Sequence, residues 1–87
     1  MEHLYWHLGS YARGAVFEVH LRGSTARVCL MDGDEYQAYL DGDEYEYHGD
    51  FYDLTPAVLE VPYDDDWWIV VDSNPDDIKV TVNQVFD

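Results

Sequence analysis

The sequence predicts an all-β domain, a small antiparallel β-sandwich or barrel of about seven strands with one short helical turn near residues 33–40. Three observations support this prediction. Apolar residues recur mostly with a period of two, turn residues separate the apolar segments at short intervals, and 47% of the chain is hydrophobic. With 87 residues, the chain has the length of one domain, so we expect residues 1–87 to share one modest core.

Two adjacent segments show the period of two most clearly. Every second residue of 15–22 is apolar, which indicates a half-buried strand, and residues 27–31 form another with Val28 and Leu30 facing inward. Because only a short turn at Gly23-Ser24 separates the two, we expect them to form a hairpin.

Five further segments are predicted as strands: 3–8, 45–48, 58–61, 67–71 and 79–86. Pro62 ends the segment before it, because proline cannot donate to a strand ladder. In the segment that follows, Trp67, Ile69 and Val71 share one face, so we expect Trp67 in the core and Trp68 on the opposite face.

One segment departs from the strand period. Asp32 can cap a helix, and Glu35 three residues later completes a capping box. Three side chains then fall on one helical face: Tyr36, Tyr39 and Leu40. Gly42 can supply a left-handed helix end.

The formal net charge of −15 arises from nineteen acidic residues against four basic ones, Arg13, Arg22, Arg27 and Lys79. No Lys or Arg lies between Val28 and Ile78, where most of the acids are found. Such a surface repels nucleic acid and anionic lipid and attracts basic proteins and cations. We therefore expect neither direct nucleic-acid binding nor membrane association.

The N-terminus has neither the basic head nor the long apolar stretch of a signal peptide, and no apolar run reaches the roughly 20 residues of a membrane helix. We therefore expect a cytoplasmic protein, in the host bacterial cytoplasm if a phage encodes it. The only cysteine, Cys29, cannot form an intrachain disulfide, and its apolar neighbours indicate a structural thiol.

The pentapeptide DGDEY occurs at residues 32–36 and 41–45 and suggests a calcium loop. Counted from Asp32 or Asp41, however, neither copy places glycine and glutamate where an EF-hand loop needs them. His3 and His7 would lie about 13 Å apart on a strand, too far for one zinc ion. We expect no metal and no cofactor, with weak calcium binding left open.

No catalytic group is predicted. Paired carboxylates occur throughout, so spacing singles out no acid–base pair, and glycine-rich phosphate loops are absent. We therefore expect a non-enzymatic protein.

Short motifs run along nearly the full chain: His3-Leu4, Gly14, Leu30-Met31-Asp32, Tyr36, Tyr39, Gly42, Tyr47-His48-Gly49, Thr55-Pro56, Val61-Pro62, Trp67 and Val71-Asp72. In these residues the chain resembles the bacterial domain-of-unknown-function family eighteen-eighty-three, whose members are small all-β domains of about this length. The resemblance implies the fold, and it implies no activity and no catalytic residue.

Three departures from that family pattern make this chain an unusually acidic version. Members tend to carry a glycine before the tryptophan, a glycine-rich turn after the aspartate, and Arg or Lys after the glycine matched by Gly42. The corresponding segments here are 64–66 (DDD), 73–77 (SNPDD) and 43–46 (DEYE).

The acidic segments lead to a DNA-mimic hypothesis. Alternate side chains on one strand face are about 6.6–6.8 Å apart, and acidic loops can fill the space between them. Over a short length, such rows approach the charge density of DNA, about one charge per 1.7 Å. We therefore predict an inhibitor that blocks the DNA-binding surface of a bacterial defence complex, comparable to the anti-CRISPR and anti-restriction proteins of phages.

The predicted partner-binding residues are Asp32, Asp34, Glu35, Asp41, Asp43, Glu44, Tyr45, Glu46, Tyr63, Asp64, Asp65, Asp66, Trp68, Asp76 and Asp77. The carboxylates would supply the attraction, and the aromatic side chains would supply specificity. For Trp68 an equal alternative is that it covers the other side of the sandwich.

The alternative function is a ligand- or protein-binding β-domain of a halophilic organism, in which the charge is generic. The excess of aspartate over glutamate and the single lysine are typical of such proteins. The interleaving of aromatic residues with the acids favours the mimic. The partner's identity and the oligomeric state stay open.

Overall fold

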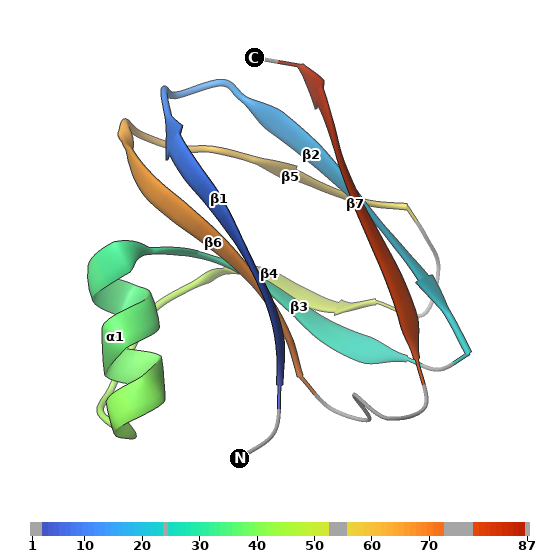
Figure 1. The fold of residues 1–87 in the computed structure, drawn as a ribbon, viewed down its shortest axis with the longest axis horizontal. Helices are drawn as coiled ribbons and strands as arrows, with labels where there is room; N and C mark the ends of the chain where they lie inside the picture. Colours follow the sequence, from blue (N-terminus) through green and yellow to red (C-terminus); the bar gives the residue numbers. More distant parts are fainter. Residues whose placement is uncertain (1–2, 24, 53–55, 73–77, 87) are drawn as a thin grey trace.

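The computed structural model describes residues 3–23, 25–52, 56–72 and 78–86. Its elements, in chain order, are β1 (Leu4–Tyr11), β2 (Val16–Arg22), β3 (Ala26–Asp32), α1 (Gly33–Asp41), β4 (His48–Tyr52), β5 (Ala57–Glu60), β6 (Asp65–Asp72) and β7 (Lys79–Phe86) (Figure 1). Within these ranges no helix is long and apolar enough to cross a lipid bilayer.

The strands form two antiparallel sheets that pack against each other. Sheet A has the strand order β1-β6-β3-β4, and sheet B has the order β5-β2-β7. The predicted fold class, a small antiparallel sandwich of seven strands with one short helix, is confirmed.

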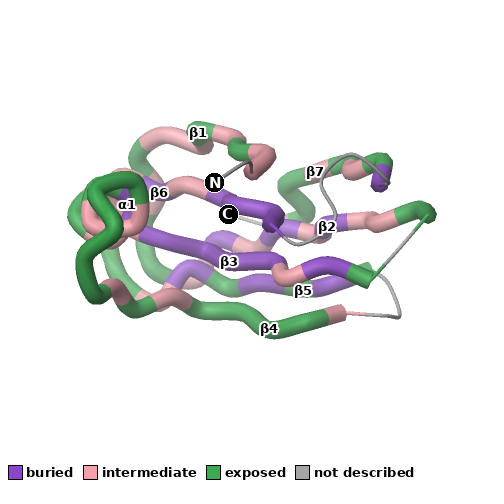
Figure 2. Tube along the Cα trace, turned by 90° about the horizontal axis from the view of Figure 1, so that it is seen from below, coloured by how far each residue is buried: buried purple, intermediate pink, exposed green. Residues whose placement is uncertain are grey.

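The core between the sheets consists of the side chains that the period of two places inward. The largest contributions come from Phe17, Val19, Val28, Leu30, Trp67, Ile69 and Val71, all buried. Figure 2 shows the buried positions following the middle of β3 and β6. Full burial of a side chain of this size stabilises the fold by roughly 1.5–3 kcal/mol.

A second, smaller core lies on the outer face of sheet A. Helix α1 packs there against β3 and β6, and it buries Tyr36 against Cys29, Met31 and Val70. Both faces of β3 and β6 are therefore covered, which explains why these strands read as continuous apolar runs rather than as strict alternation.

The helix begins and ends as the sequence predicts. The backbone N–H of Glu35 donates to Asp32 at 2.8 Å, and the Glu35 carboxylate accepts the N–H of Asp32 at 3.0 Å. Gly42, with φ of 76°, ends the helix in the left-handed conformation. Leu40, which was predicted on the same helical face as Tyr36 and Tyr39, is 49% exposed. The side of α1 that faces the sheet lies between Tyr36 and Tyr39. Leu40 lies at the edge of that side, next to Tyr36 and away from Tyr39.

The predicted hairpin between β2 and β3 is also wrong. β2 pairs with β5 and β7, whereas β3 pairs with β4 and β6, so the two edges of each strand are already occupied. The chain crosses from sheet B to sheet A after Arg22, through Gly23 with φ of 112°.

Strand boundaries differ most at the fourth strand. The prediction placed a strand at 45–48, but β4 begins at His48 and runs to Tyr52. Tyr45 and Tyr47 lie outside the sheet, and the guanidinium of Arg27 lies over both of their rings. β1 extends to Tyr11, three residues past the predicted segment.

Candidate functional site

The start of α1 and the start of β6 lie at the same end of sheet A. β3 and β6 are antiparallel neighbours, and Asp32 at the end of β3 lies opposite Trp67 near the beginning of β6. The acidic segment 64–66 therefore lies beside the first turn of α1, on one side of the molecule in Figure 1. Register between the strands, not proximity in sequence, brings these carboxylates together.

Tyr63 joins the two segments. Its hydroxyl donates a hydrogen bond to the Asp32 carboxylate, and its carbonyl oxygen accepts the indole N–H of Trp67 at 3.1 Å. Burial raises the pKa of Tyr63, and so do the bond to Asp32 and the negative charges of Asp32, Glu35 and Asp65. Three carboxylates from two segments thus act on one hydroxyl group.

Residues 43–46 complete this side of the molecule. They run alongside α1 and enclose with it an open groove of about 760 Å³, lined by Asp34, Glu35, Ala38, Asp43, Glu44, Tyr45 and Glu46. Burial raises the pKa of Glu35, and the charges of Asp32 and Glu46 raise it further. Glu35 therefore lies between the carboxylates of β3 and those of 43–46.

These carboxylates extend from the start of β6 along α1 and its groove to the segment after the helix, and we call the whole group the acidic end: Asp32, Asp34, Glu35, Asp43, Glu44, Glu46, Asp64, Asp65 and Asp66. Within the described part of the chain, the side-chain ion pairs join His7 to Asp66, His20 to Glu18 and Arg27 to Asp72. None of these pairs joins a lysine or arginine side chain to the acidic end, although Arg13 lies beside it and donates its backbone N–H to the Asp64 carboxylate at 2.9 Å. Arg22 and Lys79 lie opposite each other in sheet B, at the end of β2 and the start of β7.

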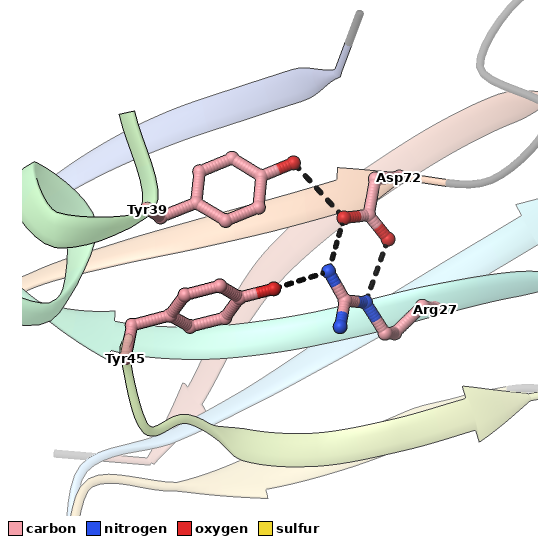
Figure 3. A network of polar contacts seen from close by, with 4 residues as sticks. All are labelled: Arg27, Tyr39, Tyr45 and Asp72. Carbon is pink, nitrogen blue, oxygen red and sulfur yellow. Dashed lines mark hydrogen bonds and ion pairs between the residues drawn. The ribbon is translucent and has the colours of Figure 1, made fainter. Parts of the chain in front are cut away.

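The acidic segment 43–46 is anchored by a buried network beneath α1 (Figure 3). Asp72, which is 4% exposed, accepts hydrogen bonds from Nε of Arg27 at 2.8 Å, from Nη2 of Arg27, and from the Tyr39 hydroxyl at 2.9 Å. Nη2 of Arg27 also donates to the Tyr45 hydroxyl at 2.7 Å. One guanidinium thus connects β3, β6 and the segment after α1.

The network keeps Asp72 ionised. Burial alone would raise the pKa of Asp72, but the hydrogen bonds from Arg27 and Tyr39 and the charge of Arg27 outweigh it and lower the pKa below its usual value. The Arg27 guanidinium also lies over the Tyr47 ring, 5.0 Å from its centroid. Arg27 is held by its ion pair with Asp72. The hydrogen bond from Arg27 therefore sets the position of the Tyr45 hydroxyl.

The structure brings most of the predicted site residues together. The acidic end contains nine of them, with Tyr45 and Tyr63 beside it. Asp41 is not counted in this group: it is the last residue of α1, just before segment 43–46, and Gln37 donates to its carboxylate at 3.1 Å. Asp76 and Asp77 lie outside the described residues.

Trp68 lies where the alternative prediction placed it, covering the other side of the sandwich. It is partly buried on the outer face of sheet A, with its ring stacked on Tyr36 at 4.3 Å and on His7 at 4.1 Å between centroids. It therefore covers the sheet rather than standing inside the acidic rim.

Sequence reasoning missed two parts of this region. It treated Arg27 only as one of the few basic residues, although an arginine within an apolar strand signals a buried partner, and Asp72 at the end of another apolar strand is the matching acid. It also missed Tyr5 and weighed His7 only as a zinc ligand, although the alternation of β1 places both on the outer face of sheet A.

Neither a metal centre nor a reactive thiol is found in this region. Within residues 3–23, 25–52, 56–72 and 78–86, no three His, Cys, Asp or Glu side chains form a group that could hold a metal ion. Burial raises the pKa of Cys29 to about 12, which keeps it a thiol rather than a nucleophilic thiolate.

Comparison with known proteins gives one family. A family model described as Domain of unknown function (DUF1883) matches residues 1–85. No curated protein and no solved structure matches the chain.

Proposed function

The chain belongs to the DUF1883 family of domains of unknown function, and from this premise we propose that it is a non-enzymatic DNA mimic. In this proposal the acidic end occupies the DNA-binding surface of a bacterial defence complex, of the anti-CRISPR or anti-restriction type. The protein would act in the bacterial cytoplasm, encoded by a phage.

One observation carries the proposal: carboxylates from three separate segments lie along α1 and the start of β6, and among the described residues no lysine or arginine side chain forms an ion pair with them. Unneutralised like charges destabilise the compact state by self-repulsion. A protein tolerates that cost most readily where the charge is used by a partner.

Hydrogen bonds tie the acidic segments to the fold, as a preorganised mimic would need. The capping box holds Asp32 and Glu35, the Tyr63 hydroxyl holds Asp32 against the 64–66 segment, and the Arg27 network holds Tyr45. A surface organised before binding loses little conformational entropy when the partner engages it.

The chemistry of the partner follows from this charge. A groove that binds DNA displays lysine and arginine and carries condensed anions when it is empty. The acidic end would replace those anions and steer the encounter, so affinity would fall steeply as salt rises.

The test is a mobility-shift competition. A purified CRISPR effector complex is mixed with its target duplex, and the protein is added at low and at high salt. The proposal predicts that the protein releases the duplex at low salt and that Glu44→Lys/Asp65→Lys abolishes the effect. Glu18→Lys/Glu60→Lys changes the net charge equally on sheet B and should still compete.

If both double variants compete equally well, location does not matter and the mimic proposal is wrong. If the wild-type protein releases the duplex from neither CRISPR effectors nor restriction enzymes, the proposal that its partner is a defence complex is wrong.

A second candidate is a ligand- or protein-binding domain of a halophile. It is favoured by Glu18, Asp50 and Glu60, which lie away from the acidic end as a generic acidic coating would place them. The salt dependence of folding separates the two candidates.

A further inference from the structure

The core of the sandwich is incompletely covered on the side where β1 and β7 lie. Both are edge strands, one in each sheet, and they occupy the same side of the molecule (Figure 2). Most of the partly buried apolar side chains that pack against the core are found here: Leu4, Trp6, Leu8 and Tyr11 on β1, and Val80 and Val82 on β7. We call the two strands with these six side chains the open side.

The open side is also free of acidic residues. β1 (LYWHLGSY) and β7 (KVTVNQVF) have eight residues each and contain no Asp or Glu, although the chain carries nineteen acids. The edge strands of the opposite side, β4 and β5, carry Asp50 and Glu60. Two molecules with a net charge of −15 repel each other, so a contact between copies requires a surface without carboxylates.

β7 presents a strand edge without the usual protection against association. Among the described strands it pairs with β2 alone, and this pairing is uninterrupted from Lys79 to Gln84. Natural edge strands avoid pairing with other chains by being short, bulged or charged. β4 and β5 have only five and four residues, and the ladder of β1 is irregular between His7 and Gly9. In contrast, β7 is long, and its only charged residue is Lys79.

We propose that β7 pairs with β7 of a second copy, antiparallel and about a two-fold axis, so that two copies of sheet B become one continuous sheet. This inference is independent of the proposed function. The backbone N–H and C=O groups on the outer edge of each β7 would then bond to the other copy. The partly buried side chains of the open side would be covered by those of the second copy, which adds apolar burial to the hydrogen bonds.

The sequence of β7 is compatible with pairing to itself. Both copies must turn the same face toward their cores, so opposed residues lie an even number of positions apart in β7. A pair centred on Val82 places Thr81 opposite Asn83, which are both exposed, and Val80 opposite Gln84. No two like charges are then opposed, and the Thr–Asn pair is polar on both sides.

A second copy suits the open side better than the basic partner of the proposed function does. The basic partner is attracted by carboxylates, and these two strands have none. The acidic groove between α1 and residues 43–46 lies across the molecule from β7 (Figure 1). A dimer formed through β7 therefore leaves the groove of each copy exposed.

The first test is sedimentation equilibrium of the purified chain over a wide concentration range, at low and at high salt. We expect a monomer–dimer equilibrium whose dissociation constant falls as salt rises, because salt screens the repulsion between the copies. Binding of the basic partner has the opposite salt dependence, so the two associations cannot be confused.

A charge placed on β7 tests the location of the contact. Thr81→Asp brings two carboxylates close to the two-fold axis and should raise the dimer dissociation constant by at least about tenfold. Thr81 lies opposite His20 on β2, so we expect the monomer to stay folded, which circular dichroism checks. The matched control is Gln37→Glu, which adds the same charge on an exposed position of α1 and should leave the dissociation constant unchanged.

Cysteine cross-linking tests the same contact without adding charge. Directly opposed residues of antiparallel strands have Cα atoms about 4.5–5.5 Å apart, which a disulfide can span. Thr81→Cys/Asn83→Cys should therefore form a covalent dimer on oxidation, while Gln37→Cys should not. The native Cys29 is buried and does not interfere.

The outcomes are distinct from those of the duplex competition. A chain that stays monomeric at every concentration and salt overturns this inference and leaves the DNA-mimic proposal standing. A dimer that Thr81→Asp does not weaken, or that fails to cross-link through positions 81 and 83, uses another surface and also overturns it.

Discussion

Tyr63 and Asp32 lie 31 residues apart, and the hydroxyl of the tyrosine donates a hydrogen bond to the carboxylate of the aspartate. The same carboxylate accepts the backbone N–H of Glu35 and so caps α1. One side chain therefore both starts the helix and holds the acidic segment 64–66 beside it.

Removing this hydroxyl should loosen the acidic end. Tyr63→Phe leaves the ring in place but deletes the bond to Asp32, and we expect the free energy of unfolding to fall by about 1 kcal/mol. Urea unfolding measures the loss. Tyr5→Phe serves as the control, because Tyr5 is exposed and none of its described contacts is a hydrogen bond; an equal loss in both variants would contradict the role of the Asp32 contact.

The Arg27–Asp72 pair should be the most sensitive polar contact. Arg27→Met leaves the Asp72 carboxylate buried without its cation, which we expect to cost about 3–5 kcal/mol in unfolding free energy. The double variant Arg27→Met/Asp72→Leu removes both charges and should recover much of that loss. A single variant that unfolds like the wild type in urea would show that the pair is unimportant.

Two carboxyl groups give the stability a defined pH dependence. Glu35 has a raised pKa in the folded protein, so its protonation favours folding, and stability should fall as pH rises through its folded pKa. Asp72 has a lowered pKa in the folded protein, so its ionised form favours folding. Its contribution to stability is present when the pH is above the usual aspartate pKa, and it is lost as the pH falls through the pKa of Asp72 in the folded protein.

We therefore expect the melting temperature to be highest on the acidic side of neutrality. It should decrease once the pH falls below the usual aspartate pKa. Thermal unfolding across pH measures the profile. Glu35→Gln keeps an oxygen for the cap but cannot ionise, so its curve should lose the decline at higher pH. If the pH profile of Glu35→Gln matches that of the wild type, the decline at higher pH is caused by other carboxylates of the acidic end.

Gly49 is required where β4 pairs with β3, opposite Cys29. A Cβ at this position would lie 2.0 Å from the carbonyl oxygen of Val28, and φ is 141°. We expect Gly49→Ala to destabilise the fold by at least about 1–3 kcal/mol and to expose the β3–β4 amides to hydrogen exchange. Gly33→Ala is the control, since a Cβ there meets nothing within 4 Å; equal effects would refute the explanation.

Salt should distinguish local repulsion from adaptation to high salt. If repulsion at the acidic end limits stability, the melting temperature rises with salt, and Glu44→Lys/Asp65→Lys raises it at low salt more than Glu18→Lys/Glu60→Lys does. Thermal unfolding by circular dichroism measures both. A chain that folds only above about 1 M salt would instead support the halophile candidate.

The sequence by itself determined most of the elements and their faces, with β4 as the main exception. The period of two selected the inward residues of β2 and β6, and the capping box and Gly42 placed α1, because these signals depend on neighbours within a few residues. Tertiary structure decided which strands pair. The hairpin expected at Gly23-Ser24 does not form, since the edges of β2 and β3 are taken by strands distant in the sequence.

The candidate site divides in the same way. The acidic residues and their excess were visible in the composition, but the approach of segment 64–66 to the start of α1 depends on the register of β3 with β6 and on the Tyr63–Asp32 bond. The pairing of Arg27 with Asp72 joins residues 45 positions apart. Contacts over such separations are set by how the sheets close, which no local pattern of residues specifies.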